Sequence, residues 1–215
     1  MNEIAKIDSI PYVIEGALPD RYPRGWFCIG AEFAVSTQPI MLNYFGTSLV
    51  AYRGEDTGSV HVLDAYCPHM GANLADGTVK GESVVCPFQE WSWGGCGIFY
   101  NIPYAKKIPP KACIKSWSVH EANQLVYIWF DPDGGEPIEE QAIPDDAMLA
   151  EEGWTPWVIR RAIVDNNCRE LIDNMADKAH FGPVHGLPEI TYFANISEGH
   201  KYTQIMHGVS QLGGH

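Results

Sequence analysis

Two short segments of the sequence carry side chains that bind transition metals. The first holds Cys67 and His69, and the second begins at Cys86, with sixteen residues (70 to 85) between the two. Two loops that each open with a cysteine, two or three residues before a second ligand, are the arrangement that holds an iron–sulfur cluster. In one version, two thiolates bind one iron, two imidazoles bind the other, and the neutral ligands raise the reduction potential. The residue types therefore indicate one-electron chemistry.

The second loop departs from this pattern at Gln89, which stands where a second imidazole would bind. An amide offers a neutral carbonyl oxygen, which is a harder and weaker iron ligand than imidazole. The sequence predicts either no cluster or an altered one. In the altered site Cys96, on a glycine-rich turn ten residues after Cys86, replaces the missing ligand. In the other case the two loops persist as turns and bind nothing.

A third segment, residues 174–185, contains Asp177, His180 and His185. The apolar spacing predicts a helix over 166–179 that ends at Gly182-Pro183. His180 would then project from the last turn of this helix and His185 would return from the turn, so that both imidazoles converge on one ion. A mononuclear iron(II) site of this type also needs a carboxylate. Glu189 and Glu198 are nearby carboxylates that we consider for this role.

The elements that position the first two segments are predicted to be strands. Between Gly25 and Phe130 the chain shows short apolar or alternating runs separated by turn residues, which is typical of a small antiparallel sandwich or barrel. The predicted strands are 25–34, 42–53, 60–64, 83–87, 98–100 and 124–130. After Gly153, a further strand is expected over 155–164, and the alternating pattern returns from Thr191.

Most of the charge belongs to one segment. The chain of 215 residues has a formal net charge of -13, and nine acids with no Lys or Arg lie between Asp131 and Gly153. With its prolines and glycines this segment is predicted to be a solvated connector over 131–152.

So acidic a chain is not expected to bind nucleic acid or anionic lipid, because phosphates favour basic surfaces. No basic leader or membrane-length apolar run is present, so we expect a cytoplasmic protein with reduced cysteines.

The remaining aromatic and cysteine residues are predicted to serve packing. Tryptophans bury large apolar areas in small β domains. The residues expected in the core on this basis are Trp91, Trp93, Trp117, Trp129, Trp154 and Trp157, and Cys28, Cys113 and Cys168 are expected to be buried as small apolar residues.

The metal-binding segments resemble Rieske non-heme iron oxygenases that hydroxylate aromatic rings and steroids. Their Rieske loops follow C-x-H, a spacer and C-x-x-H, and their catalytic domain carries N-x-x-D-x-x-H-x-x-x-x-H, which 174–185 matches. Within this family the 3-ketosteroid 9α-hydroxylases are most similar. The stretches that carry this resemblance are Arg24-Gly25-Trp26-Phe27, CPHMGANLADGTVKGESVVCPF (67–88), Trp91-Ser92-Trp93-Gly94-Gly95, Ile102-Pro103-Tyr104-Ala105 and LIDNMADKAHFGPVHGLPEITYF (171–193).

The resemblance implies an α+β protein with a Rieske-like antiparallel β-sandwich over 20–130, the acidic connector over 131–152 and the start of a helix-grip-like catalytic domain over 153–215. It also implies a [2Fe–2S] cluster on Cys67, His69 and Cys86, and mononuclear iron(II) on His180 and His185. Asp177 matches the aspartate that links the Rieske histidine of a neighbouring subunit to the iron. A head-to-tail trimer, a reductase that supplies electrons and a steroid-type substrate are further implications.

Two departures from the family pattern lead to our functional hypothesis. Gln89 replaces a cluster ligand, and the family's third iron ligand comes from an element far beyond the second histidine, whereas thirty residues follow His185. We therefore expect a non-catalytic structural or regulatory subunit that joins a full-length oxygenase subunit in a hetero-oligomer. In that assembly the Gln89 amide would donate to Asp177 of an adjacent subunit. The alternatives are a working monooxygenase subunit whose missing ligand comes from another chain, and a small electron carrier that uses Cys96.

Overall fold

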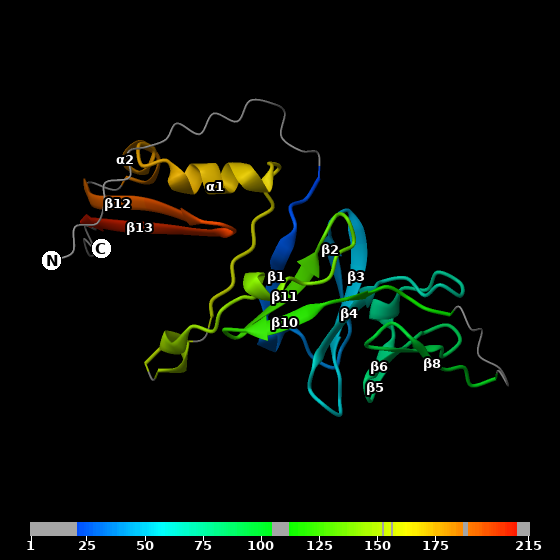
Figure 1. Cartoon of the computed structure of the whole chain (residues 1–215). Helices are drawn as coiled ribbons and strands as arrows, with labels where there is room; N and C mark the ends of the chain where they lie inside the picture. The colour runs from blue at the N-terminus through cyan, green and yellow to red at the C-terminus, as the bar shows by residue number, and fades with distance from the viewer. Residues whose placement is uncertain (1–20, 105–111, 152, 156, 187–188, 210–215) are drawn as a thin grey trace.

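The computed structural model describes residues 21–104, 112–151, 153–155, 157–186 and 189–209 (Figure 1). Residue 20, at which we expect the first domain to begin, lies outside these residues. The described part combines antiparallel sheets with two short α-helices, as the predicted α+β class requires. Among the described helices, none is long and apolar enough to cross a membrane.

Three small antiparallel sheets form the first part of the chain. The first has the order β1-β11-β10, the second β2-β3-β4-β9 and the third β5-β6-β7-β8. Their strands are β1 (Gly25–Ala31), β2 (Ile40–Tyr44), β3 (Thr47–Arg53), β4 (Val60–Asp64), β5 (Thr78–Lys80), β6 (Ser83–Val85), β7 (Ser92–Gly94), β8 (Phe99–Asn101), β9 (Ser116–Trp117), β10 (Val119–Ala122) and β11 (Leu125–Phe130). Four short 3-10 helices complete the elements: η1 (Glu32–Ala34), η2 (Leu74–Asp76), η3 (Glu139–Gln141) and η4 (Ala147–Ala150).

Strand β3 is buried on both faces and separates two apolar cores. Leu49 and Ala51 pack in the core beneath the first sheet, whereas Val50 and Tyr52 pack in the core that contains the third sheet. All four side chains are fully buried. Because successive side chains of a strand point to opposite faces, the second sheet serves as the middle layer between the two cores.

Several predicted strand boundaries were wrong. The single strand expected over 42–53 is two strands, because Phe45 and Gly46 adopt left-handed backbone conformations with φ of 53° and 72° and reverse the chain. The strand expected over 25–34 ends at Ala31, where η1 begins. The described residues of 155–164 form no strand.

The C-terminal part contains α1 (Cys168–Ala176), α2 (Phe181–His185) and a hairpin of β12 (Glu189–Glu198) and β13 (Lys201–Val209). Figure 1 shows α1 running along the hairpin and α2 above one end of it. The helix predicted over 166–179 is shorter, and Gly182-Pro183 lies inside α2 rather than ending α1. Pro183 is tolerated there because it occupies the first helical turn, where a backbone N–H has no intrahelical acceptor.

The acidic segment 131–151 is tied to the first sheet. Asn123 donates to the backbone oxygen of Pro144 at 2.9 Å and accepts from the backbone nitrogen of Asp146 at 2.7 Å. Trp129 donates to the oxygen of Gly135 at 2.9 Å. The segment is therefore anchored to the β10–β11 turn and to β11, although most of its carboxylates are exposed as predicted for a solvated connector.

Candidate functional site

The two ligand loops share one backbone geometry. In the first, the nitrogen of Cys67 donates to the oxygen of Ala72, and the nitrogen of Gly71 donates to the oxygen of Cys67, both at 2.8 Å. In the second, the nitrogen of Cys86 donates to the oxygen of Trp91 at 2.8 Å, and the nitrogen of Glu90 donates to the oxygen of Cys86 at 3.1 Å. The fourth residue after each cysteine is left-handed, with φ of 74° and 57°. The fold therefore presents the two cysteines on equivalent turns.

Both cysteines of the loops are buried. Cys67 is 2% exposed and Cys86 is 3% exposed. Burial raises the pKa of the Cys67 thiol, the backbone N–H of His69 and the indole N–H of Trp93 lower it, and the neighbouring Cys86 raises it. Among the described residues, the buried Trp93 Nε1 has no conventional hydrogen-bond partner. An indole N–H left beside a thiol is a donor that a thiolate sulfur in a metal site would accept.

His69 lies flat against an indole. Its ring stacks on Trp91 with a centroid separation of 4.2 Å and an interplanar angle of 8°. Trp91 is 8% exposed, whereas His69 is exposed at the surface of the first loop. The side chain that follows the second loop therefore supports the ligand of the first loop.

Gln89 is fixed by a directed pair of hydrogen bonds. Trp91 Nε1 donates to the hydroxyl of Tyr104 at 2.7 Å, and this hydroxyl donates to Gln89 Oε1 at 2.6 Å. Because an indole can only donate, the Tyr104 hydroxyl accepts from it and directs its own hydrogen at the amide oxygen. The Gln89 amide nitrogen faces the other way, where its one contact among the described residues is with Met70 Sδ at 3.7 Å.

This donor set does not fit a Rieske cluster. Two thiolates are available for one iron, but His69 is the one imidazole available for the other, and the oxygen of Gln89 is engaged by Tyr104. Cys96 lies exposed on the turn between β7 and β8. In the described part of the chain, no three His, Cys, Asp or Glu side chains form a group that could hold a metal ion. The structure therefore does not bring Cys96 together with Cys67 and Cys86.

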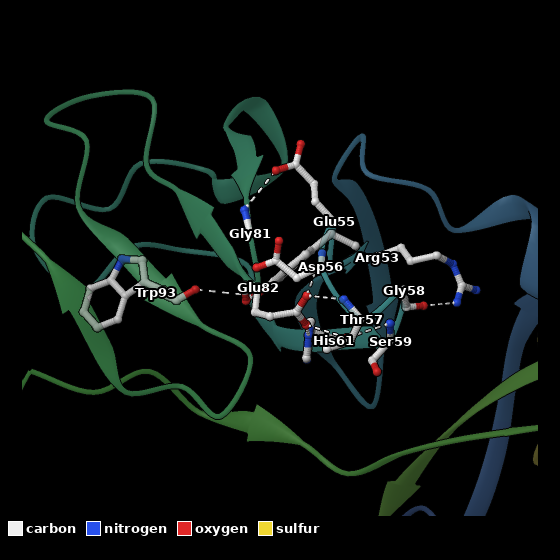
Figure 2. A network of polar contacts seen from close by, with 11 residues as sticks. Arg53, Glu55, Asp56, Thr57, Gly58, Ser59, His61, Gly81, Glu82 and Trp93 are labelled. Carbon is white, nitrogen blue, oxygen red and sulfur yellow. Dashed lines mark hydrogen bonds and ion pairs between the residues drawn. The ribbon is translucent and has the colours of Figure 1, made fainter.

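Glu82 ties the second ligand loop to the middle sheet (Figure 2). It lies on the turn before β6, the strand that leads into Cys86. Its carboxylate accepts from the backbone nitrogens of Asp56 and Thr57 at 3.1 and 2.9 Å, and from His61 Nε2 at 2.7 Å. The contact with His61 and then the backbone N–H of Thr57 lower the pKa of Glu82 to about 2. The ionised carboxylate therefore holds the β3–β4 loop through these hydrogen bonds.

Tyr52 reinforces this connection from the core. Its side chain is fully buried, and its hydroxyl lies 3.2 Å from the backbone oxygen of Glu82 and 3.4 Å from that of Trp93. Burial raises the pKa of this hydroxyl. The neutral phenol therefore links β3 to the two strands, β6 and β7, that flank the second ligand loop.

His180 and His185 converge, although not from the elements predicted. His180 is the N-cap of α2 and His185 is its last residue, and their ring centroids are 5.1 Å apart. His180 Nδ1 lies 2.6 Å from the backbone oxygen of Asp177. A carbonyl can only accept, so Nδ1 carries the hydrogen, and in the neutral imidazole Nε2 keeps its lone pair. Nε2 is buried and has no hydrogen-bond partner among the described residues.

The two histidines fit two positions of a mononuclear iron(II) site. A buried imidazole nitrogen with a free lone pair is what such an ion binds, and the backbone contact on Nδ1 is a common orienting interaction. Iron(II) held there would supply open coordination positions for dioxygen. Neither Glu189 nor Glu198 forms a three-residue group with the two histidines. Asp177 is exposed, and its carboxylate accepts from the backbone nitrogen of Ala179 at 2.8 Å.

Three side chains of these sites carried no sequence signal of their role. Tyr104 reaches Gln89 across fifteen residues. Asn195 and Gln204 contact the end of α1 from the hairpin at 3.0 and 2.6 Å. Each lies outside the motifs that define the ligands, and spacing alone does not reveal such long-range contacts.

Comparison with protein families finds two matching domains. A family described as the Rieske [2Fe-2S] domain matches residues 25–118, and the 3-ketosteroid 9alpha-hydroxylase C-terminal domain matches residues 128–215. The chain belongs to the Rieske oxygenase family. The resemblance stated from the motifs is thus confirmed, and the family carries the cluster and the non-heme iron that the motifs imply.

Curated relatives cover nearly the whole chain. A probable 3-ketosteroid-9-alpha-monooxygenase oxygenase component of Rhodococcus rhodochrous is 45% identical over 93% of this chain and 50% of its own length. The corresponding component of Mycolicibacterium smegmatis is 45% identical over 91% of this chain and 51% of its own length. The chain therefore spans about half the length of the curated relatives that it matches.

A solved structure confirms the fold. The crystal structure of dicamba monooxygenase bound to 3,6-dichlorosalicylic acid is 25% identical, with a TM-score of 0.66 over 85% of this chain and 54% of the other. The Rieske sandwich and the α+β class predicted from the sequence are therefore correct.

Proposed function

We propose that this chain is a non-catalytic, structural or regulatory subunit of a steroid-type Rieske monooxygenase. The observation that carries the proposal is the engagement of Gln89 Oε1 by the Tyr104 hydroxyl at 2.6 Å. The amide oxygen is the atom of Gln89 that could coordinate iron, but it is a weaker iron ligand than imidazole, and one of its two lone pairs already accepts the Tyr104 hydrogen. A Rieske cluster thus lacks its fourth ligand, and the usual entry point for electrons is lost.

The same hydrogen bond suits Gln89 to a different role. Because Tyr104 holds the oxygen, the amide nitrogen is presented at the surface beside Met70. We infer that this nitrogen donates to the carboxylate of Asp177 on an adjacent oxygenase subunit. Asp177 is exposed and accepts one backbone hydrogen bond, so its second oxygen can accept another. This contact would retain the subunit interface without redox chemistry.

A second candidate function is favoured by the histidine pair. The buried lone pair of His180 Nε2 beside His185 supports metal binding at the catalytic site. A subunit with this site and a carboxylate from elsewhere would hydroxylate a steroid-type substrate, with electrons from a reductase. This candidate requires a working cluster, which the donor set at position 89 opposes. The electron-carrier alternative depends on Cys96, which the structure does not bring to the other two cysteines.

One experiment tests the proposed function. The chain is purified alone and with the Rhodococcus rhodochrous oxygenase component, under anaerobic conditions with iron and sulfide supplied. Iron content, acid-labile sulfide, visible absorbance and oxygen consumption with a 3-ketosteroid and a reductase are then measured. We expect the chain alone to be colourless and free of sulfide. Stoichiometric cluster in the native chain would contradict the proposal, and steroid-dependent oxygen consumption by the chain alone would establish the second candidate.

A further inference from the structure

The C-terminal end of α1 is held by two amide side chains of the hairpin. Asn195 Nδ2, from β12, donates to the backbone oxygen of Ala176 at 3.0 Å, and Gln204 Nε2, from β13, donates to that of Met175 at 2.6 Å. The last carbonyls of a helix have no intrahelical partner. Asn195 and Gln204 face each other across the hairpin, so a matched pair caps the helix end.

Tyr202 determines which way the Asn195 amide points. The Tyr202 hydroxyl lies 2.8 Å from Asn195 Oδ1, and an amide oxygen can only accept, so the hydroxyl donates to it. The nitrogen of Asn195 is therefore turned toward Ala176. Tyr202 is half-buried, and the hydrogen bond itself lies at the exposed surface of the hairpin.

The capped carbonyl is next to the residue that orients His180. Asp177 follows Ala176 directly, and its backbone oxygen accepts from His180 Nδ1 at 2.6 Å. The Asp177 carboxylate accepts from the nitrogen of Ala179 and closes the turn. A shift of the backbone at Ala176, which Asn195 restrains, would displace the adjoining Asp177 residue and with it the oxygen that holds His180 Nδ1. The His180 side chain is 12% exposed, so its Nε2 has little access to a replacement partner.

We propose that Asn195, oriented by Tyr202, is a positioning residue that fixes the tautomer of His180 for metal binding. Tyr202 donates to Asn195, and Asn195 donates to the end of α1. The position of the α1 end sets the position of the Asp177 oxygen, which orients the imidazole of His180. His180 Nε2 is thereby presented with its lone pair beside His185 to a divalent metal ion. This assignment concerns the second site and is independent of the fate of the cluster position at Gln89.

Titration with cobalt(II) tests this proposal on the full chain. We expect cobalt to bind through His180 and His185, with an absorbance in the visible range that the His180→Ala variant lacks. Asn195→Ala should weaken the affinity up to about 10-fold, at the low end of the loss of about 10- to 100-fold that follows removal of a direct outer partner, because Asn195 acts on His180 through the Asp177 turn. Tyr202→Phe should weaken it in the same direction by a smaller factor, because Asn195 keeps its amide but loses its orientation. Tyr192→Phe, on the same hairpin, is the matched control and should bind as the native chain does.

Ring nitrogen NMR of the metal-free chain separates positioning from simple support of the fold. In the native chain we expect the His180 hydrogen on Nδ1, and in Asn195→Ala and Tyr202→Phe a mixture of the two tautomers. Native tautomer and native cobalt affinity in a folded Tyr202→Phe chain would overturn the proposal, even if Asn195→Ala fails to fold. Equal cobalt binding by the native and His180→Ala chains would overturn it as well. Both outcomes leave the test of cluster content at Gln89 unaffected.

Discussion

At the scale of single residues, the proposed loss of the redox site depends on Gln89. The equivalent backbone hydrogen bonds around Cys67 and Cys86 and the buried thiols are all in place. Cys67, His69 and Cys86 nevertheless do not form a three-residue metal-binding group among the described residues. The turns that present the two cysteines are therefore formed, while the ligand set itself is incomplete.

Restoring that side chain should restore the cluster. We expect Gln89→His, reconstituted with iron and sulfide under anaerobic conditions, to gain acid-labile sulfide and the visible absorbance of a [2Fe–2S] centre, because two thiolates and two imidazoles are then available. Gln89→Ala is the matched control and should stay colourless. Failure of Gln89→His to gain sulfide, in a chain that melts like the native one, would show that the loops have lost more than a ligand.

Tyr104 is the residue that fixes the orientation of the Gln89 amide. Tyr104→Phe leaves the buried N–H of Trp91 without its acceptor and frees the Gln89 amide to rotate. Because water can partly replace the exposed hydroxyl, we expect a loss of about 1 kcal/mol in the free energy of unfolding. Urea denaturation measures it, and the side-chain amide resonances of Gln89 should report the released rotation. Tyr100→Phe, at an exposed neighbouring phenol, should leave both unchanged.

At the scale of elements, the Glu82 carboxylate holds the β3–β4 loop against the turn that precedes β6. Its pKa is about 2 in the folded chain, below the ordinary value of 4.5. The stabilisation from this depressed pKa is fully present above pH 4.5 and disappears as the pH falls toward 2.

Glu82→Gln should remove most of this pH dependence. We expect the variant to lose about 1–2 kcal/mol in the free energy of unfolding at pH 6, since an amide cannot accept all the donors that surround the carboxylate. At pH 3 the difference from the native chain should shrink. Urea denaturation at both pH values checks the result. Glu55→Gln is the control and should show a smaller loss, because Glu55 accepts only from the nitrogen of Gly81 and an amide oxygen can still accept that hydrogen bond. An equal loss at both pH values would contradict the role of the charge.

The elements differ in how far the sequence could predict them. β4 was predicted with its observed bounds because alternation and flanking turns define it locally. β5, β7, β9 and β10 were missed, since strands of two to four residues depend on their partners in the sheet. Trp154 and Trp157 were wrongly placed in the core. They are 58% and 40% exposed, because Trp157 lies in, and Trp154 just before, the stretch 155–164 that was predicted to be a strand and whose described residues are irregular.

The candidate sites show the same division between local and long-range information. The spacing of cysteine and histidine identified the candidate ligands because these residues lie close together in short loops. The capping of α1 by Asn195 and the contact of Tyr104 with Gln89 depend on the folded arrangement, so no pattern predicts them.

The prediction that Cys28, Cys113 and Cys168 are buried was wrong; all three are exposed. Apolar neighbours in the sequence do not determine which face of an element is covered.

At the scale of the whole molecule, two exposed groups on different parts of the chain suit it to a mixed assembly. The Gln89 amide nitrogen is presented at the ligand loops, and the carboxylate of Asp177 follows α1. A donor at one site and an acceptor at the other permit head-to-tail contacts with a related subunit. An isolated surface hydrogen bond contributes little, so the contact must lie within a larger interface to matter.

Co-expression with the Rhodococcus rhodochrous oxygenase component tests this arrangement. We expect a tagged native chain to retain the relative through size-exclusion chromatography, in an oligomer that contains both chains. If the relative carries an aspartate where this chain has Asp177, Gln89→Ala should weaken the binding about 10-fold, because that carboxylate would lose a charge-assisted hydrogen bond worth about 1.5 kcal/mol. Gln38→Ala, at an exposed glutamine far from the loops in the sequence, is the control and should bind normally. A native chain that elutes as a monomer and retains none of the relative would exclude the structural role, because neither surface group would then have a partner.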